Sequence, residues 1–341
     1  MGRKELRMDE LELKHLMIYH QKKLSDFRPE KAVHYCNLDT FNKIVQPFVE
    51  GKTMDRYDDK KSIKYKVKYI NFFATDLNYL NDREEYNIGT KHVESVAGPF
   101  NKSTNNEETF IACFCDKTDN LTQWKYYGKD AGLAVEFDTE NVQINYCDKC
   151  TCPKTDDDKK EFPQKHDIRF MPFEVFYCSR LEDAGSSETK EIQKRIKSML
   201  PNDDELASIT EQTAKVGVVP YIKHIAFEDE CESRIILYHI QHGKERCSST
   251  NYRTGNIIKP FLNLRLFYGN RKAIKHIPIK SVTVGPCPEP RLLIRSIFHM
   301  LEENYELRER NIEDELDKKG FVKTSTGIIV TSSSAPFRSF Q

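Results

Sequence analysis

The sequence predicts an α+β fold in which a mixed, mainly antiparallel sheet forms the core and helices flank it. Short apolar runs typical of strands recur along the chain and alternate with segments of helical periodicity. The predicted strands are residues 32–36, 69–73, 110–115, 132–137, 173–177, 233–240, 281–284 and 327–331. Because helices are interspersed among these strands, we expect long antiparallel or mixed pairing.

Four helical segments are predicted. Asn37 precedes Phe41, Ile44 and Val45 at helical spacing, and asparagine is a favoured helix cap. A strongly polar helical stretch begins at Ser186, and another helix follows Pro201 and Asn202. A long amphipathic helix is predicted over residues 289–307, with its apolar face formed by Leu292, Ile294, Ile297, Phe298 and Leu301.

We expect one α+β domain over residues 31–338, preceded by an N-terminal helix in residues 1–30. The 341 residues allow one large domain or two smaller ones, since single cores stop growing near ~250 to 300 residues. Residues 50–66 are mostly charged and are predicted to form a solvated loop. Residues 139–167, rich in Asp, Lys and Cys, are predicted to be an inserted surface loop, and residues 182–220 a helical insertion.

The charge balance argues against one class of protein. The chain has 53 Lys and Arg against 53 Asp and Glu, so it lacks the net basic footprint of a domain that holds nucleic-acid backbone tightly. A local basic groove remains compatible with this balance. No apolar run approaches the ~18 to 20 residues of a membrane span, and the first residues lack the apolar segment of a signal peptide. We therefore expect a cytoplasmic protein that does not enter a membrane.

Ten cysteines are too few for a disulfide scaffold in a chain of this length, so their spacing is interpreted as packing or metal binding. Cys147 and Cys150 have the spacing that holds one zinc ion; Cys152 would add a third thiolate, and His166 could complete the site. A second CxxC is absent, so incidental loop thiols are the alternative. The sequence contains no phosphate-binding loop and no dinucleotide-binding glycine motif.

Three polar and aromatic clusters lie where strands or helices are predicted to begin or end. They are His34 and Tyr35; Asn81, Asp82 and Glu85; and Gln123, Trp124, Tyr127 and Gly128. Each has a structural explanation: a half-buried histidine, a turn with a helix cap, and aromatic packing. Each also has a functional one: a hydrogen bond to a ligand, a polar wall of a site, and a platform for stacking.

A fourth cluster places carboxylates at the start of an apolar strand. In an extended chain, Glu230, Glu232 and Arg234 project to the same side. A solvated edge with one ion pair would explain this pattern. The alternative is a pair of carboxylates held beside a reacting sugar.

In their order along the chain, these clusters resemble the motifs of the bacterial domain-of-unknown-function 2971 family. The resemblance covers residues 33–338. The matching motifs are His34-Tyr35, Asn81-Asp82 with Glu85, Gln123-Trp124 with Tyr127-Gly128, Glu230 and Glu232 with Arg234, and Pro336-Phe337-Arg338. Cys36 stands where this family often has threonine, and residues 139–167 and 182–220 look like additions.

That family in turn looks like the ADP-ribosyltransferases, which include bacterial toxins that modify nucleic acid. The resemblance implies an ADP-ribosyltransferase-like fold and NAD as substrate. Glu232 would be the catalytic carboxylate that stabilises an oxocarbenium-like ribose, and Glu230 would orient the acceptor.

The same resemblance implies a set of NAD-binding residues. His34, with the neighbouring Tyr35, would contact the ribose or the nicotinamide amide, and Trp124 or Tyr127 would stack on the cationic nicotinamide ring. Arg234 and Arg338 would meet the pyrophosphate, because a guanidinium matches phosphate oxygens in a bidentate fork.

We therefore expect an NAD-dependent ADP-ribosyltransferase-like enzyme, a bacterial toxin or phage-defence effector that modifies protein or nucleic acid. Two alternatives remain. One is a non-catalytic ligand-sensing or interaction module that uses the same clusters as a recognition pocket. The other is a nuclease that holds Mg²⁺ with the carboxylates of Asp82, Glu85, Glu230 and Glu232, since hard cations prefer oxygen ligands.

Overall fold

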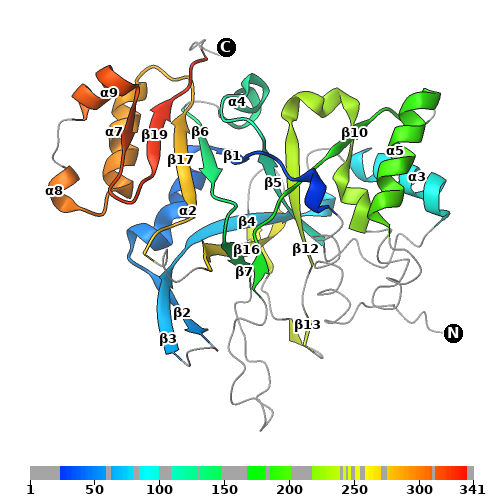
Figure 1. Ribbon diagram of the computed structural model, residues 1–341, viewed down its shortest axis with the longest axis horizontal. Coiled ribbons are helices and arrows are strands. Elements are labelled where there is room, and N and C mark those ends of the chain that lie inside the picture. Colours follow the sequence, from blue (N-terminus) through cyan, green and yellow to red (C-terminus); the bar gives the residue numbers. More distant parts are fainter. Residues whose placement is uncertain are drawn as a thin grey trace, which may run out of the picture.

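The computed structural model describes residues 24–58, 63–79, 84–99, 109–128, 131–146, 167–181, 185–200, 217–238, 241–242, 245–246, 250–253, 258–269, 275–308 and 312–335. It is a mixed α+β structure with several helices around an open, mainly antiparallel sheet (Figure 1). This confirms the predicted fold class at that level.

Within the described residues the sheet has 13 strands, and ten of them follow one path in the order β18-β19-β17-β6-β1-β5-β4-β16-β7-β8. Strand β12 pairs with β5 and β9, and β15 pairs with β16. Only β17 and β19 are paired in parallel among these strands of the described chain. The strands are β1 (Ala32–Cys36), β4 (Ile70–Asp76), β5 (Thr109–Cys115), β6 (Leu133–Phe137), β7 (Val142–Asn145), β8 (Ile168–Arg169), β9 (Phe173–Glu174), β12 (Glu232–Tyr238), β15 (Thr250–Arg253), β16 (Lys259–Tyr268), β17 (Ile279–Val284), β18 (Phe321–Lys323) and β19 (Ile329–Ser332).

Helices and short ribbons surround this sheet. In Figure 1, α7, α8 and α9 lie beside β17 and β19, whereas α3 and α5 lie at the opposite end, beyond β12. The helices are α2 (Leu38–Val49), α3 (Glu84–Ala97), α4 (Leu121–Tyr127), α5 (Ser186–Met199), α7 (Pro290–Leu301), α8 (Tyr305–Arg308) and α9 (Glu313–Lys319), with 3-10 turns η1 (Ser25–Phe27), η2 (Leu77–Tyr79), η6 (Val219–Tyr221) and η7 (Ile225–Glu230). The ribbons are β2 (Thr53–Asp58) with β3 (Ile63–Lys68), β10 (Phe176–Cys178) with β11 (Ile222–His224), and β13 (Gln241–His242) with β14 (Glu245–Arg246).

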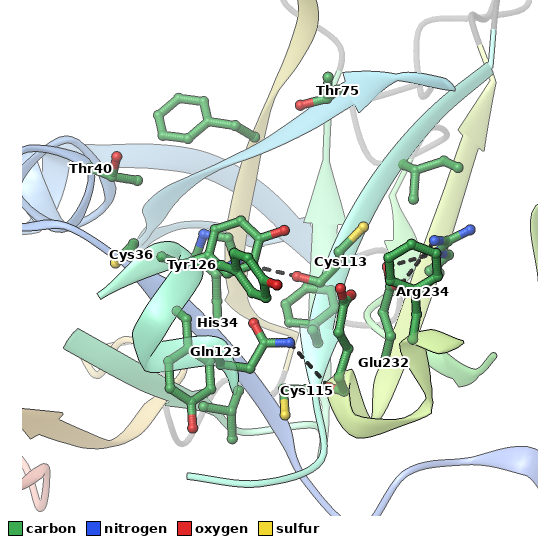
Figure 2. Close-up of a pocket in the computed structure, with 18 of the residues that line it drawn as sticks. His34, Cys36, Thr40, Thr75, Cys113, Cys115, Gln123, Tyr126, Glu232 and Arg234 are labelled. Carbon is green, nitrogen blue, oxygen red and sulfur yellow. Dashed lines mark hydrogen bonds and ion pairs between the residues drawn. The ribbon is translucent and has the colours of Figure 1, made fainter. Parts of the chain in front are cut away.

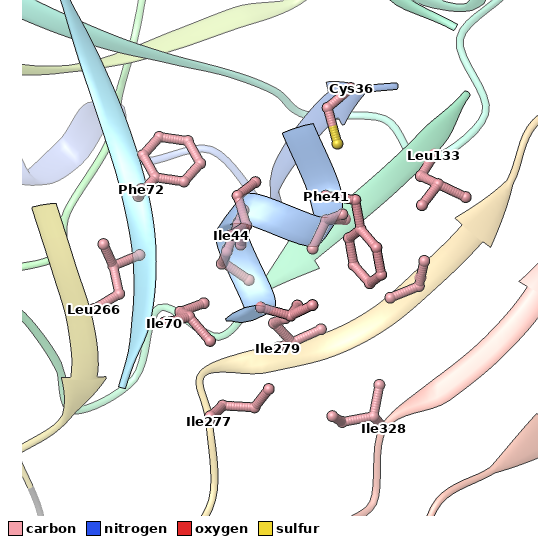
Figure 3. Close-up of a cluster of buried hydrophobic side chains, with 14 of the residues drawn as sticks. Cys36, Phe41, Ile44, Ile70, Phe72, Leu133, Leu266, Ile277, Ile279 and Ile328 are labelled. Atoms are coloured by element: carbon pink, nitrogen blue, oxygen red, sulfur yellow. The ribbon is translucent and has the colours of Figure 1, made fainter. Parts of the chain in front are cut away.

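Helix α2 forms as its sequence predicts and covers the largest core. The Asn37 side chain accepts a hydrogen bond from the Thr40 amide at 2.8 Å, which satisfies one of the amides left unpaired at the helix start. Ile44 then points from the helix toward Ile70 and Phe72 of β4, and Phe41 lies on the side of Leu133 of β6 (Figure 3). The apolar spacing of this helix therefore fixes which face packs on the sheet.

Strand β12 is buried on both faces. Ile235 and Leu237 belong to the large core, while Ile236 and Tyr238 belong to a second core with residues of α3, α5 and η6. A strand that is covered on both sides has no polar face, which explains why its apolar residues are consecutive rather than alternating. Its charged residues, Glu232 and Arg234, precede the apolar run and are themselves buried.

A split in the sheet lies along one edge of β5. Strand β12 pairs with β5 along its whole length on one edge. On the other edge, β1 pairs only at Cys115, and β4 pairs only at Phe110 and Ile111. In the described part of the chain, residues 112–114 therefore have no partner strand on that edge. Strands β1 and β4 diverge there and leave space for side chains.

Two predicted loops contain strands instead. Residues 50–66 include β2 and the first part of β3, which form an antiparallel ribbon. Arg56 of β2 is buried: its guanidinium bonds Asp167 at 3.2 Å and lies 4.3 Å from the Phe267 ring centroid. Residues 139–167 begin with β7, which pairs with β16. Tertiary partners thus override the polar composition that predicted loops in both places.

Several predicted segments lie outside the described residues. They are residues 1–23 of the N-terminal helix, residues 147–166 of the predicted surface loop and residues 201–216 of the helical insertion. Within the insertion, α5 forms over Ser186–Met199 and buries Ile192, Ile196 and Met199 in the second core.

Trp124 is enclosed by glycines, and this arrangement predicts a specific sensitivity. A Cβ atom at Gly285 would lie 2.8 Å from Cε3 and Cζ3 of Trp124 and 3.0 Å from the Gly132 carbonyl oxygen. We expect Gly285→Ala to lower the free energy of unfolding by about 1 to 3 kcal/mol, because the indole and the backbone cannot both move away. Urea denaturation measures this change. Gly185→Ala, where an added Cβ meets nothing within 4 Å, should change it by less than about 0.5 kcal/mol; equal effects would contradict the close packing of Trp124.

Candidate functional site

The split between β1 and β4 opens into a pocket of about 570 Å³ (Figure 2). Its walls come from β1, α2, β4, η2, β5, α4, β11, η7, β12 and β16, segments that are far apart in the sequence. The predicted site residues that line it are His34, Tyr35, Gln123, Tyr127, Glu230, Glu232 and Arg234. Three of the four predicted clusters thus contribute to one cavity.

Glu232 and Arg234 form a buried bidentate ion pair on β12. The Arg234 Nε donates to Glu232 Oε1 at 2.8 Å, and Nη2 donates to Oε2 at 2.9 Å. The third nitrogen, Nη1, donates to the Pro220 carbonyl at 2.7 Å. Arg234 is only 2% exposed, so its guanidinium holds Glu232 and η6 in place. Its three guanidinium nitrogens thus bond protein groups, and the predicted contact of Arg234 with a pyrophosphate stays a prediction.

Lys223 on β11 joins the two carboxylates. Its Nζ lies 2.8 Å from Glu230 Oε2 and 2.8 Å from Glu232 Oε2, and its side chain is 6% exposed. Burial of an ammonium is costly unless a carboxylate neutralises it, and Glu230 and Glu232 both supply that countercharge. The sequence analysis missed Lys223 because no motif surrounds it. Its one signal is a lysine inside the apolar stretch Val219–Ile222 and Ile225, which a buried partner would explain.

The electrostatics of this cluster keep Glu232 ionised. Burial by itself would raise the pKa of its carboxyl, but Arg234 and then Lys223, with a hydrogen bond from Cys113, lower that pKa from 4.5 to about 2. The pKa of the Cys113 thiol is raised well above its ordinary value, first by burial and then by the negative charge of Glu232. Cys113 is therefore a neutral hydrogen-bond donor at neutral pH and a poor nucleophile.

The backbone at this cluster is not the extended chain that the sequence predicted. Glu230 is the last residue of η7, and Cys231 adopts a left-handed conformation with φ of 46° before β12 begins at Glu232. The two carboxylates therefore leave a turn rather than one face of a strand. They meet because both reach Lys223.

His34 lies at the split itself. Its Nδ1 is 3.2 Å from the carbonyl oxygen of Cys113, in the part of β5 that lacks a partner strand on this edge. Because a carbonyl can only accept, Nδ1 carries the proton in this contact. The Phe72 ring packs against the imidazole with centroids 4.8 Å apart. The ring is thus oriented by groups on both sides while it lines the pocket.

The aromatic wall comes from α4. Tyr126 and Tyr127 line the pocket and are 60% and 41% exposed. Desolvation first, and then the carboxylate of Glu230, raise the pKa of Tyr127 to about 12, so its hydroxyl is a proton donor at neutral pH. Trp124, by contrast, is 1% exposed and donates its indole N–H to Asp119 at 2.7 Å. Of the two rings predicted as alternatives for stacking on a ligand, Tyr127 lines the pocket and Trp124 does not.

Hydrogen bonds join α4 to the end of η7, which carries Glu230. Asn120 caps the helix, and its Nδ2 donates to the Asp229 carbonyl at 2.7 Å. Gln123 Nε2 donates to the Glu230 carbonyl at 3.1 Å. The Tyr35 hydroxyl donates to the Lys117 carbonyl and accepts from the Asn120 amide, both at 2.8 Å. Gln123 and Tyr35 therefore line the pocket chiefly as residues that position its walls.

The remaining predicted site residues cannot be placed in the pocket from the described part of the chain. Asn81, Asp82, Arg338, Cys147, Cys150 and Cys152 lie outside the described residues. Glu85 belongs to α3, but its side chain is also outside them. Among the described residues, no three or more His, Cys, Asp or Glu side chains are grouped so as to hold a metal ion. Within the same residues, no helix is long and apolar enough to cross a membrane.

A second cavity of about 730 Å³ lies away from these residues. Its walls include Glu136 of β6, Ser281 and Thr283 of β17, and Thr331 of β19. None of the predicted site residues lines it. The pocket at the split is therefore the candidate site.

The candidate site is thus a pocket in a split of the sheet of an α+β fold, and a histidine, tyrosines and a pair of carboxylates line it. The model of the family described as Protein of unknown function (DUF2971) matches residues 123–235. That segment contains Gln123, Tyr127, Glu230, Glu232 and Arg234, and the match supports the family resemblance over about a third of the chain. Neither a curated protein nor a solved structure matches this chain.

The lowered pKa of Glu232 predicts an acid-dependent loss of stability. The contribution of this carboxylate, on the order of 3 kcal/mol for a shift from 4.5 to about 2, is complete above about pH 4.5 and is lost as the pH falls toward 2. Glu232→Gln leaves Lys223 and Arg234 buried without their full countercharge, so it should cost about 3 to 5 kcal/mol at pH 7.

Urea denaturation of wild type and Glu232→Gln at pH 7 and pH 3 measures this. The difference between the two proteins should be smaller at pH 3. The control is Glu191→Gln, which removes an exposed pair with Arg195 and should cost less than about 0.5 kcal/mol at both pH values. A difference for Glu232→Gln that does not depend on pH would contradict the ion-pair assignment.

Proposed function

We propose that this protein is an NAD-dependent ADP-ribosyltransferase-like enzyme and that the pocket at the split binds NAD. The observation that supports this most directly is the convergence of His34, Tyr127, Glu230 and Glu232 on one cavity of about 570 Å³. A cavity of this size is in the range of small-molecule and cofactor sites. Its aromatic wall and its carboxylates suit a ligand that contains a cationic aromatic ring.

The proposed reaction breaks the bond between nicotinamide and ribose. The bonding electron pair leaves with nicotinamide, which becomes neutral, and the ribose develops oxocarbenium character. An ionised carboxylate in a largely desolvated pocket stabilises that positive charge. His34 would contact the ribose or the amide, and Tyr127 or Tyr126 would stack on the nicotinamide ring. Lys259 lines the same pocket and is a candidate for the pyrophosphate in place of Arg234.

A ligand-sensing module is the second candidate. The observation that favours it is that Lys223 and Arg234 already neutralise the carboxylate pair, which weakens the field on a developing cation. A magnesium-dependent nuclease has less support, because a divalent ion bound between Glu230 and Glu232 would have to displace the Lys223 ammonium.

The test is incubation of the purified protein with adenine-labelled NAD and a bacterial lysate, followed by nuclease or protease digestion of the labelled products. Wild type should transfer label, and Glu230→Gln should transfer at least 100-fold less. The digestion that removes the label identifies the acceptor as nucleic acid or protein. Folded wild-type protein that leaves NAD intact, yet binds it, would overturn the enzyme in favour of the sensing module.

His34→Ala tests the position of NAD in the pocket. Loss of one hydrogen bond to the ligand should weaken NAD binding by about 10-fold, measured by calorimetric titration. The control is His299→Ala, since His299 lies on α7 and lines neither cavity. An unchanged affinity in the His34 variant would rule out the assigned contact.

A further inference from the structure

We infer that Glu230, rather than Glu232, is the carboxylate that contacts the ribose, and that Glu232 is a positioning residue acting through Lys223. This division of roles rests on the proposed NAD chemistry for its catalytic meaning. Its structural basis is the different surroundings of the two carboxylates. It reverses the roles that the family resemblance implies for this pair.

Glu232 has no capacity left for a substrate hydroxyl. It accepts from Arg234 Nε and Nη2, from Lys223 Nζ, and from the Cys113 thiol. A carboxylate offers about four lone-pair sites, and these four donors occupy them. Its side chain is 6% exposed. A substrate could reach Glu232 only by displacing a buried charged partner, which is costly.

Glu230 differs from Glu232 in both its hydrogen-bonding capacity and its exposure. Among the described residues its carboxylate has one hydrogen-bond partner, Lys223, which meets Oε2 and leaves Oε1 for a ligand. Its side chain is 14% exposed, more than twice the value for Glu232, and it lines the pocket. Glu230 is therefore the member of the pair that can accept a hydrogen bond from a ligand without loss of an existing one.

The backbone under Glu230 is also held firmly. Gln123 bonds its carbonyl, and Asn120 bonds the carbonyl of Asp229, so η7 is anchored on α4. Lys223 then fixes the carboxylate from the other side. A substrate-contacting group needs this kind of support, because a displacement of about 1 Å can cost 100-fold in rate.

In this arrangement Lys223 transmits the role of Glu232. The two carboxylates and the two cations balance in charge, and Lys223 is shared between the carboxylates. In the reaction, Glu230 stabilises the ribose as the bond to nicotinamide breaks with its electron pair. The acceptor nucleophile forms the new bond to the same ribose carbon, and its proton passes to Glu230 and then to solvent.

Three variants separate the roles: Glu230→Gln, Glu232→Gln and the double variant Glu232→Gln/Lys223→Met. Glu230→Gln should lower kcat at least 100-fold with little change in KM for NAD, and should keep the midpoint of thermal unfolding within about 2 °C of wild type. Glu232→Gln should lower that midpoint by about 5 °C or more, because two buried cations lose countercharge.

The double variant removes one charge of each sign and should restore the midpoint, whereas its turnover should stay low, because Lys223, which fixes the carboxylate of Glu230, is lost. A stable double variant with wild-type turnover would overturn the inference, because Lys223 would then not transmit the role of Glu232 to Glu230. A Glu230→Gln variant with wild-type kcat would also overturn it.

These results are distinguishable from failure of the proposed function. If wild type does not turn over NAD, the enzyme assignment fails, and the unfolding midpoints still test the surroundings of the pair. Stability lost in Glu232→Gln, kept in Glu230→Gln and recovered in the double variant would support a saturated Glu232 and an available Glu230. Equal losses in both single variants would overturn the inference.

Discussion

The neutralisation of Glu232 by Arg234 and Lys223 is the interaction on which the pocket depends. A buried carboxylate without countercharge would take up a proton or destabilise the fold, whereas this one is held ionised with a pKa of about 2 despite its burial. The same contacts link four segments, because Arg234 also bonds Pro220 of η6 and Lys223 also bonds Glu230 of η7. One charge cluster therefore determines how the turn before β12 sits against the second core.

The split along β5 provides the space that this cluster faces. Strands β1 and β4 pair with opposite ends of the same edge, so the middle of β5 bonds a side chain, His34, rather than a strand. Helix α4 closes one side and is anchored by Asn120, Gln123 and the enclosed Trp124. His34, Tyr35 and Gln123 pair with backbone groups in this gap, and the charged side chains of the cluster pair with one another. The result is a cavity with rigid walls and a small number of available polar atoms.

Local rules predicted much of the frame. Capping predicted the helix after Asn37, and apolar periodicity predicted the strand at β12. The placement of polar residues at the ends of elements selected His34, Tyr127 and Glu230 as site candidates. The family resemblance assigned Trp124 and Arg234 to NAD, whereas in the structure Trp124 is buried and Arg234 bonds protein groups. Local rules also assigned residues 50–66 to a loop, although Arg56 there finds a buried partner in Asp167. Composition indicates which conformation a segment would adopt in isolation, whereas Arg56 is stabilised by contacts with residues far away in the sequence.

The sequence by itself determined the α+β class and the clusters that could carry chemistry, because periodicity and capping act over a few residues. The tertiary structure alone decided that three of those clusters share one pocket, that Lys223 bridges the carboxylates, and that Glu232 and Glu230 differ in their free hydrogen-bonding capacity. These outcomes depend on contacts between residues far apart in the chain, such as Lys117 with Tyr35 and Asn120 with Asp229. Burial and charge pairing are set by such contacts, and spacing along the chain does not encode them.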